Sequence, residues 1–488
     1  MQESIVIGGH LQQSGQPIEL LAKYANRHGL IAGATGTGKT VTVQGLVEGF
    51  ARLGVPVFVA DVKGDLSGLG AAGRPHAKVQ QRLDHIGLTN FDFAANHLAC
   101  WDLAGQQGIQ VRLSLSELGP QLLSRLLELN DTQEGALTLA FQYADDQGLL
   151  MLDLADLKTT LQFLGEHPEA LDQGYGRVAK ATLAAISRRL LVLEREGAAA
   201  LFGEPGLQIQ DLLRRDSQGR GLINLLAADS LINKPRLYST FLLWLLAELF
   251  ETLPEVGDKG KPELVFFFDE AHLLFQDAPK AFLQKVEQVV RLIRSKGVGI
   301  YFISQSPADI PDSILAQLGN RIQHALRAYT PKERQAVKVA AQSFRENPGV
   351  NCEELISTLG VGEALVSMLQ EGGVPAPVQP CLMAPPRSRI GPLTAAERQQ
   401  WINQEPLLAR YAQAVDPHSA HEELQRRMQA QSMPERGQSK ARAGRAAGQA
   451  SSNRQGIAES FMKSVARSIG SNLGRALIRG VLGSLLKR

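Results

Sequence analysis

One stretch of eight residues combines side-chain types and a spacing that suit phosphate binding. Gly33-Ala-Thr-Gly-Thr-Gly-Lys-Thr40 fits the phosphate-binding loop pattern at every fixed position. Its glycines let backbone N–H groups surround a polyphosphate, because no Cβ atom stands in the way. Lys39 supplies a positive charge for the β- and γ-phosphates, and Thr40 supplies a hydroxyl ligand for Mg²⁺. The residues expected to bind ATP are Gly33, Ala34, Thr35, Gly36, Thr37, Gly38, Lys39 and Thr40.

Two adjacent carboxylates follow a strand-like run of large apolar residues, Leu264–Phe268. Asp269 is expected to hold the Mg²⁺ shell, as the acidic partner of a phosphate loop does. Glu270 is expected to polarise a water in line with the γ-phosphate and so to act as the base. Ionised carboxylates cost several kcal/mol to bury unpaired, so two of them here indicate a functional site. The alternative is that they only cap a helix that follows.

Further polar residues are expected at the tips of neighbouring strands. Gln305 follows the strand Val298–Ile303 and is a candidate to sense the γ-phosphate or the attacking water. Its alternative role is to satisfy backbone groups in the turn. Asp61 and Asp65 follow another apolar strand. They are candidates to contact the water ligands of Mg²⁺ or the edge of the phosphate site. Equally, they are suited to capping the turn and the next helix.

The elements that must position these residues indicate an α/β fold with a mainly parallel sheet. The strand His28–Ala32 leads into the loop, and the helix Val41–Leu53 leads out of it with its N-terminal dipole toward the anion. Later strands alternate with helical patterns such as Pro235–Leu253. Further strands are expected at Val55–Ala60, Gly221–Ala227, Glu263–Phe268 and Val298–Ile303.

The periodicity divides the chain into five parts. Residues 1–114 and 214–382 are predicted to form the two parts of the ATPase core. Residues 115–213 show helical periods almost throughout and are predicted to be an all-α insertion. This insertion has more Asp and Glu than Lys and Arg, which disfavours a nucleic-acid binding site in it. We therefore expect the insertion to act as a lid or as a contact between subunits.

The last two parts form a tail. Residues 383–456 are predicted to be a loosely packed, partly disordered linker, because much of this composition buries too little surface to order. Residues 457–488 form a basic, amphipathic helical pattern with small residues between its apolar and basic rows. This C-terminal helix is expected to dock on the acidic body, on a partner or subunit, or on an anionic membrane or DNA.

Composition limits the setting of the protein. The 488-residue chain has three scattered cysteines, which form neither a metal spacing nor a disulfide framework. No targeting or membrane-spanning stretch is evident, and a reducing, cytoplasmic location is expected. The net charge is only +2, but residues 433–488 carry 11 Lys and Arg against 2 Asp and Glu. The body is therefore acidic and the tail basic.

Six stretches of the sequence together form a recognisable set. They are the phosphate loop, Asp61-x-Lys-Gly-Asp65, Phe268-Asp-Glu-Ala-His272, Arg294-Ser-Lys-Gly-Val-Gly299, Ser304-Gln-Ser-Pro307 and Asn320-Arg-Ile322. Together they resemble the HerA–FtsK superfamily of ring-forming ATPases, most closely the HerA-like YjgR family, and the resemblance covers most of the chain.

The resemblance implies a RecA-like core, hexamers with ATP at the subunit interfaces, and translocation on double-stranded DNA. By position it makes Arg294 the arginine that reaches the neighbouring subunit's ATP, with Arg27 as a second contributor. HerA proper has an N-terminal barrel that docks its nuclease partner. Only about 30 residues precede the loop here, so a nuclease partner is not expected.

Three functions compete at this stage. The first is a hexameric ATP-driven DNA translocase or helicase-like motor, which the acidic body disfavours because DNA motors usually present a basic pore. The second is an oligomeric ATPase that acts on protein or at a membrane surface. The third is an ATP-binding switch with little turnover, which Glu270 disfavours because a switch has little need of a base.

Overall fold

A mixed sheet of twelve strands runs through the described part of the chain. The computed structural model describes residues 3–172, 176–231, 233–257, 259–275 and 280–432. Met1–Ala430 form one compact unit, to which the following description applies. In sheet order the strands are β2 (Pro17–Leu21), β1 (Ser4–His10), β12 (Gln379–Met383), β11 (Glu363–Ser367), β10 (Asn320–His324), β3 (Gly29–Ala32), β9 (Val298–Ser304), β8 (Leu264–Phe268), β4 (Val57–Asp61), β7 (Ile223–Ala227), β5 (Leu98–Asp102) and β6 (Ile109–Gln110).

The pairing divides this sheet into a parallel part and an antiparallel part. From β10 to β6 every neighbouring pair is parallel. Strands β11, β12, β1 and β2 extend the sheet on one side as antiparallel neighbours. The predicted α/β class with a mainly parallel sheet is confirmed. The antiparallel strands were not predicted.

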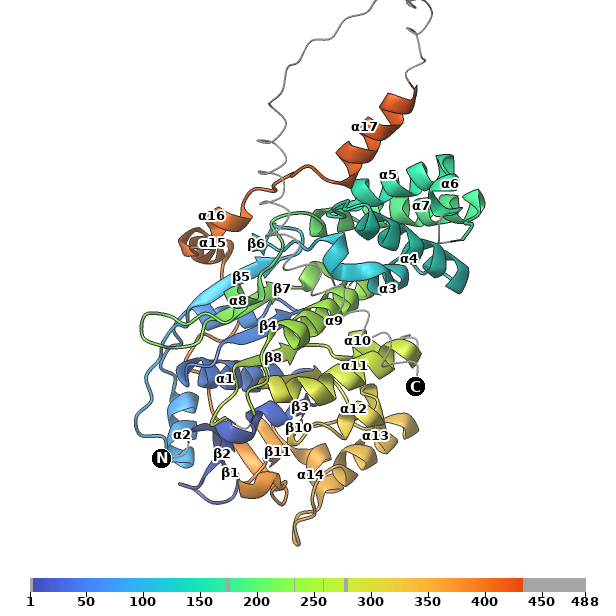
Figure 1. Cartoon of the computed structure of the whole chain (residues 1–488). Helices are drawn as coiled ribbons and strands as arrows, with labels where there is room; N and C mark the ends of the chain where they lie inside the picture. The colour runs from blue at the N-terminus through green and yellow to red at the C-terminus, as the bar shows by residue number, and fades with distance from the viewer. Residues whose placement is uncertain (1–2, 173–175, 232, 258, 276–279, 433–488) are drawn as a thin grey trace, which may run out of the picture. The chain divides into compact units, whose positions relative to one another are not determined.

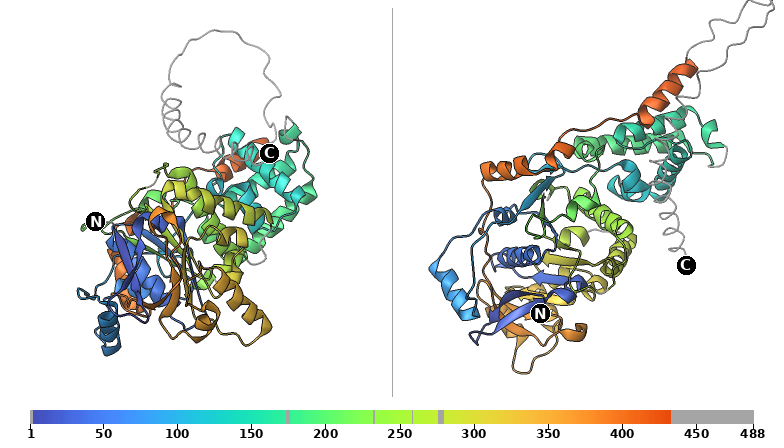
Figure 2. Two further views of the ribbon diagram at one scale, coloured as in Figure 1. Left: turned by 90° about the horizontal axis from the view of Figure 1, so that it is seen from below. Right: turned by 60° about the vertical axis from the view of Figure 1, so that its left-hand side comes forward.

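The helices lie around the sheet, as Figures 1 and 2 show. Those of the sheet domain and its C-terminal continuation are α1 (Lys39–Arg52), α2 (Ala77–Ile86), α9 (Pro235–Thr252), α10 (His272–Phe275), α11 (Lys280–Ile293), α12 (Asp312–Leu315), α13 (Pro331–Gln342), α14 (Cys352–Thr358), α15 (Ala395–Gln404), α16 (Leu408–Tyr411) and α17 (Ala420–Ser432). Short 3₁₀ turns are η1 (Ala22–Arg27), η2 (Leu66–Gly70), η3 (Ala198–Leu201), η4 (Asp229–Leu231), η5 (Arg294–Lys296), η6 (Pro307–Asp309) and η7 (Glu371–Gly373).

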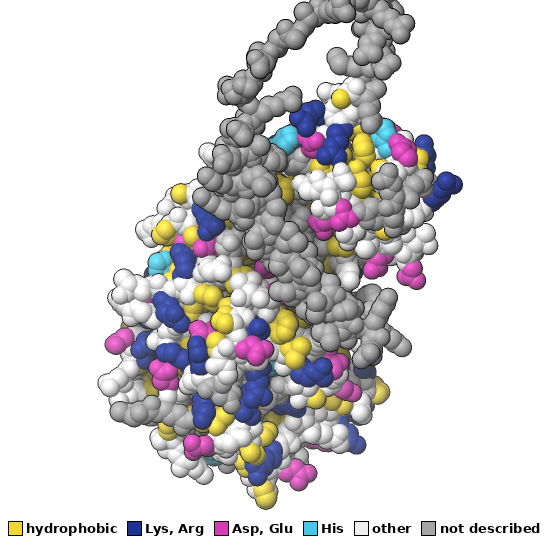
Figure 3. Space-filling view, in the orientation of Figure 1, with side chains coloured by type: hydrophobic (Ala, Val, Ile, Leu, Met, Phe, Trp, Pro, Cys, Tyr) yellow, Lys and Arg dark blue, Asp and Glu magenta, His cyan; other side chains and the backbone are white. Residues whose placement is uncertain are grey.

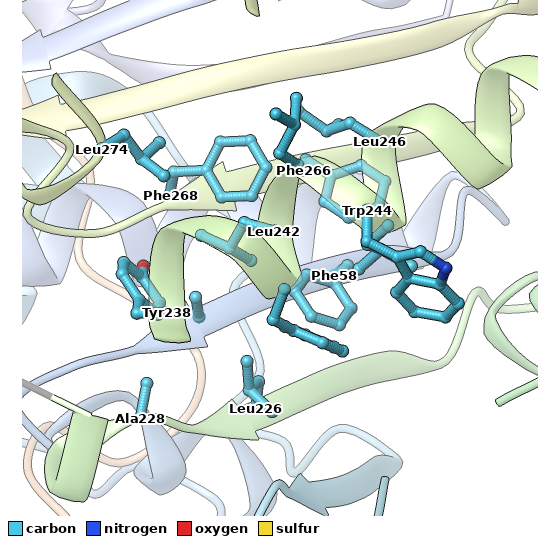
Figure 4. Packing of buried hydrophobic residues seen from close by; sticks show 14 of the residues in the cluster. Phe58, Leu226, Ala228, Tyr238, Leu242, Trp244, Leu246, Phe266, Phe268 and Leu274 are labelled. Atoms are coloured by element: carbon cyan, nitrogen blue, oxygen red, sulfur yellow. The ribbon is translucent and has the colours of Figure 1, made fainter. Parts of the chain in front are cut away.

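The central strand β8 is buried on both faces, which explains its continuous apolar sequence. On one face Phe267 packs against Phe50 of α1, with ring centroids 6.1 Å apart. On the other face Phe266 packs against Phe58 of β4 at 5.0 Å. Figure 4 shows Leu242 and other side chains of α9 on this second face. Helices on both faces hold the strand ends in place, and the phosphate-binding residues lie at those ends.

Among the described residues between β6 and β7, six helices lie in the region where the sequence predicts an insertion. They are α3 (Leu115–Leu126), α4 (Asp131–Asp146), α5 (Leu154–Glu166), α6 (Glu169–Asp172), α7 (Lys180–Arg195) and α8 (Ile209–Leu212). α3, α4 and α5 each begin with a capping box, which satisfies exposed N–H groups at the helix start. Figure 1 shows α3 to α7 grouped together near β5 and β6.

The segment after β12 packs against the core, contrary to the prediction of a loose linker from residue 383. Glu48 of α1 accepts hydrogen bonds from the backbone of Arg387 (2.5 Å) and Ser388 (3.1 Å). Trp401 of α15 donates to the carbonyl of Gly70 (3.1 Å). Tyr411 is fully buried. The prediction is wrong for residues 384–430, where buried polar and aromatic anchors compensate for a mostly polar sequence; residues 433–456 and the predicted helix 457–488 lie outside the described residues.

Glu48→Ala is expected to lower the free energy of unfolding by about 2 kcal/mol or more, because it leaves buried N–H donors without an acceptor. The donors are the backbone of Arg387 and Ser388 and the Ser388 hydroxyl. Denaturant unfolding measures the change, with the exposed Glu346→Ala as the matched control. Equal stability of both variants would contradict the anchoring of this segment by Glu48.

Candidate active site

The phosphate loop is held by hydrogen bonds to two segments that are distant in the sequence. It follows β3 and leads into α1, as the sequence predicts. Ala34 N donates to the carbonyl of Ala325 (2.8 Å), and Gly362 N donates to the carbonyl of Thr37 (2.9 Å). Gly33 has φ 153°, and a Cβ atom there would lie 2.5 Å from the Cβ of His324. Glycine is therefore required at this position both by backbone conformation and by space.

Lys39 and Thr40 begin α1 at the base of the loop. Lys39 is only 7% exposed, and its Nζ donates to the carbonyls of Gly33 (2.5 Å) and Ala34 (3.0 Å). Burial, together with the nearby Lys63 cation, lowers the pKa of Lys39, although Glu270 and Asp269 oppose this shift. The ammonium group is thus folded over the loop, where a phosphate would be cradled.

The two carboxylates after β8 have opposite environments. Burial, followed by repulsion from Glu270, raises the pKa of Asp269 to about 6 against the attraction of Lys63. Burial alone would raise the pKa of Glu270, but the nearby His272 and Lys63 outweigh it and lower that pKa to about 2. Glu270 has φ 49°, a conformation that non-glycine residues rarely adopt and that often marks a functional site.

A pocket at the carboxyl edge of the sheet brings the phosphate loop and the acids together. Lys39, Thr40, Lys63, Asp65 and Asp269 line it together with three apolar side chains. The Oδ1 atom of Asp65 is buried and has no hydrogen-bond partner among the described residues.

These residues fit Mg²⁺, which prefers oxygen ligands and usually keeps several waters and phosphate oxygens in its shell. Thr40, Asp269 and the unpartnered Asp65 offer a hydroxyl and two carboxylates. In the described part of the chain, no group of three or more His, Cys, Asp or Glu residues is arranged to hold a metal ion. A site with few protein ligands, completed by phosphate and water, is therefore the form that the residues support.

Asp61 has a structural role that distinguishes it from Asp65. Its carboxylate accepts hydrogen bonds from the backbone N–H groups of Gly64 (2.8 Å) and Leu66 (3.1 Å). Burial, then repulsion from Asp65 and Asp269, raises the pKa of Asp61 to about 7. Asp61 therefore caps the turn, and Asp65 is the one that reaches the pocket.

Gln305 lies beside Glu270, at the carboxyl end of β9. Its Nε2 donates to Glu270 Oε2 across 3.5 Å, and the side chain is otherwise exposed. The carboxylate also lies 2.6 Å from Lys63 Nζ and 3.2 Å from His272 Nδ1. The structure thus gathers Lys39, Asp269, Glu270 and Gln305 at one edge of the sheet.

Arg294 and Arg27 lie at the opposite edge. Arg294 begins η5, just before the amino end of β9, whereas Gln305 follows the carboxyl end of this seven-residue strand. At about 3.3 Å per residue the strand separates the two ends by roughly 20 Å. Arg27 ends η1 ahead of β3, with its guanidinium 5.1 Å from the ring centroid of Tyr24. Neither arginine is brought to the phosphate loop of its own chain.

A buried histidine supports this amino edge. His28 Nε2 lies 2.7 Å from the carbonyl of Val290, and His28 Nδ1 accepts from Ile300 N at 3.0 Å. Burial, with a smaller contribution from the Arg294 cation, lowers the pKa of His28 to about 4, against the opposing effect of the bond to Val290. His28 is therefore neutral in the folded protein at physiological pH.

Acidification is expected to destabilise the fold through His28. Because its folded pKa lies below the unfolded value of about 6.5, the unfolded state binds more protons between pH 6.5 and 4, and stability falls as the pH falls through this window. The contribution is about 2 kcal/mol between pH 7 and 5. Denaturant unfolding should show a smaller loss on acidification for His28→Gln than for wild type. The exposed His418→Gln serves as the control, and an unchanged pH dependence in His28→Gln would contradict the assignment.

Sequence reasoning missed three residues at the site. Lys63 lies between Asp61 and Asp65, and His272 lies two residues after Glu270. Their closeness in sequence to the predicted site residues could have identified both. His324 is buried under the loop, where its Nε2 contacts the Thr42 hydroxyl at 3.0 Å. Nothing in the sequence indicated that His324 lies near the loop, because β10 was not predicted.

Comparison with known proteins agrees with this geometry. A family model described as "Helicase HerA-like C-terminal" matches residues 9–488. A search of curated proteins gives no significant match. Among solved structures, the bacterial conjugative coupling protein TrwBdeltaN70 in its unbound form is 15% identical, with a TM-score of 0.51 over 79% of this chain and 92% of that one. The plasmid coupling protein TrwB with ADP and Mg²⁺ is also 15% identical, with a TM-score of 0.51 over 78% of this chain and 91% of that one. At this identity the likeness shows the fold, which is that of RecA-type P-loop ATPases.

Proposed function

Because this chain belongs to the family of HerA-like helicase C-terminal domains and is a P-loop ATPase, we propose that it hydrolyses Mg·ATP as a subunit of a hexameric, DNA-translocating ring. The observation that carries the proposal is the shared pocket of Lys39, Thr40, Asp65 and Asp269, with Glu270 beside it. A phosphate loop with a nearby carboxylate pair is the arrangement that hydrolysis of a terminal phosphate requires. A cytoplasmic location is part of this proposal.

In the proposed reaction, a water attacks the γ-phosphorus of ATP in line with the leaving oxygen of ADP. Glu270 accepts a proton from this water as the new P–O bond forms. The bond between the γ-phosphorus and the β,γ-bridging oxygen breaks, and ADP leaves with the electron pair. The backbone N–H groups of the loop and Lys39 hold the β- and γ-phosphates. Gln305, whose Nε2 lies 3.5 Å from Glu270 Oε2, is proposed to orient the water.

Mg²⁺, when bound, supplies positive charge to the β- and γ-phosphate oxygens. Thr40, Asp269 and Asp65 are the residues that would hold it. Burial keeps Asp269 close to the loop, and the unpartnered oxygen of Asp65 faces the same pocket.

The separation of the arginines from their own phosphate loop supports the proposed ring. Arg294 and Arg27 lie at the amino edge of the sheet, and the pocket lies at the carboxyl edge. An arginine in this position can meet the charge that develops on ATP only if the ATP belongs to another subunit. Arg294 is proposed as the main contributor and Arg27 as the second. A closed ring of six such interfaces completes every site.

DNA is the proposed substrate polymer, and a second candidate function has one observation in its favour. Residues 1–432 carry 40 Lys and Arg against 47 Asp and Glu. On the visible face of Figure 3, the basic side chains are intermixed with acidic ones. These charges would also suit an oligomeric ATPase that acts on protein or at a membrane surface. In the part of the chain that the structure describes, no helix is long and apolar enough to cross a membrane.

Measurement of ATP turnover separates these candidates. Wild-type protein should hydrolyse ATP with Mg²⁺, and double-stranded DNA should raise the rate more than single-stranded DNA or anionic liposomes do. Stimulation by liposomes alone would favour the second function. Absence of turnover under all conditions would refute the proposed hydrolysis.

A further inference from the structure

Lys63 reaches the phosphate pocket without having a part in the reaction described above. It lies in the turn after β4, whose backbone is fixed by the bonds from Gly64 and Leu66 to Asp61. Its side chain lines the pocket and is 35% exposed, and its Nζ lies 2.6 Å from Glu270 Oε1. The lysine is therefore anchored at its base and has room to move at its tip.

The contact with Lys63 occupies the carboxylate that hydrolysis needs. Oε1 of Glu270 pairs with Lys63, while Oε2 lies 3.2 Å from His272 Nδ1 and 3.5 Å from Gln305 Nε2. A carboxylate with both oxygens engaged is poorly placed to accept a proton from water, because a general base must be within hydrogen-bond reach of that proton. A change in one of these contacts would therefore accompany productive binding of ATP, and Lys63 is the residue that holds Oε1.

The terminal phosphate of ATP offers Lys63 a competing anionic partner. A lysine ammonium has three donors on a flexible four-carbon stem, so it can exchange partners within one pocket. Lys39 and Lys63 line this pocket together, so both cations would face a phosphate bound in it. ADP lacks the γ-phosphate and so offers no such partner.

We propose that Lys63 senses the γ-phosphate: it pairs with Glu270 when ADP is bound, and moves to a γ-phosphate oxygen when ATP is bound. The move frees the Glu270 carboxylate for the attacking water. This inference rests on the proposed ATPase site and adds to it a residue that distinguishes ATP from ADP and couples this distinction to the base.

Lys63→Met tests the sensor through nucleotide affinity. Titration calorimetry with Mg²⁺ compares ADP with the non-hydrolysable analogue AMP-PNP. In the variant, the preference for AMP-PNP over ADP should fall roughly 10- to 100-fold, the size of one charge-assisted hydrogen bond, while ADP affinity changes little. The matched control is Lys158→Met, which removes a lysine paired at 2.5 Å with Glu194 on the helices α5 and α7. An unchanged preference in Lys63→Met overturns the proposal.

Glu270→Gln provides an independent test through a double-mutant cycle. Its neutral amide no longer holds Lys63 by charge, so AMP-PNP affinity should rise severalfold, and this rise should disappear in the double variant Lys63→Met/Glu270→Gln. An equal rise in both backgrounds overturns the proposal. If Lys63→Met does not fold, Glu270→Gln decides alone, and the absence of a rise overturns it. If wild type binds neither nucleotide, the proposed ATPase function itself fails, which is a different outcome.

Discussion

Glu270→Gln is expected to keep ATP bound and to hydrolyse it about 10²- to 10⁴-fold more slowly than the wild-type protein, the usual range for loss of a positioned general base. The amide retains the shape of the side chain but cannot accept the proton of the attacking water. Single-turnover measurements with ATP, together with a binding titration, separate the loss of chemistry from a loss of affinity.

Lys39→Ala should also lose ATP hydrolysis, but through a loss of nucleotide binding rather than of the chemical step. Lys39 is folded over the carbonyls of Gly33 and Ala34, where it is placed to hold phosphates. Its loss should therefore weaken nucleotide binding itself. Full turnover in Glu270→Gln would show that another group activates the water.

Arg294→Ala is expected to lower turnover by about 10³-fold or more while ATP binding stays near the wild-type level. The arginine would meet charge that develops only in the transition state, so its loss should act on the rate rather than on affinity. Arg291→Ala is the matched control, since Arg291 is an exposed arginine on the helix that precedes η5. Arg27→Ala should show a smaller loss of rate than Arg294→Ala. Equal losses of rate and affinity in Arg294→Ala would indicate a structural role instead.

The central part of the fold was predictable because the local sequence pattern of each element agrees with the place of that element in the fold. A phosphate loop between a strand and a helix restricts the backbone so strongly that β3 and α1 could be placed to within two residues. β8 was recognisable because a strand buried on both faces must be apolar at every position. The order of β4, β8 and β9 then places their polar tips at one edge.

The rest of the sheet could not be predicted, because its strands are specified by tertiary contacts. β10 has the sequence Asn-Arg-Ile-Gln-His, and several of its polar side chains bond to partners that are distant in the sequence. Asn320 Nδ2, for example, donates to the carbonyls of Tyr24 and His28. β1 and β12 include glycine and proline, which are weak strand formers. Gly8 is required there because a Cβ atom would lie 2.3 Å from the carbonyl oxygen of Leu382.

At the site, the sequence indicated which residues could take part in the chemistry, but not which side chains contact one another. It proposed both Asp61 and Asp65 for the phosphate edge, but only the bonds to Gly64 and Leu66 show that Asp61 caps the turn. The pairing of Lys63 with Glu270 joins the segments that follow β4 and β8, which are far apart in the chain. Such a contact depends on how adjacent strand tips are aligned, and no local pattern reports it.

Mixing two inactive variants tests most directly the central claim that each ATP site is completed by a neighbouring subunit. Lys39→Ala subunits lack a working phosphate loop but keep Arg294, and Arg294→Ala subunits have the reverse defect. In mixed rings, some interfaces join an intact loop to an intact arginine, and ATP turnover should reappear above that of either variant alone. Subunit exchange is verified by native mass measurement with one variant carrying a mass tag. Recovery of turnover is the predicted result; verified mixed rings without any recovery would contradict the account.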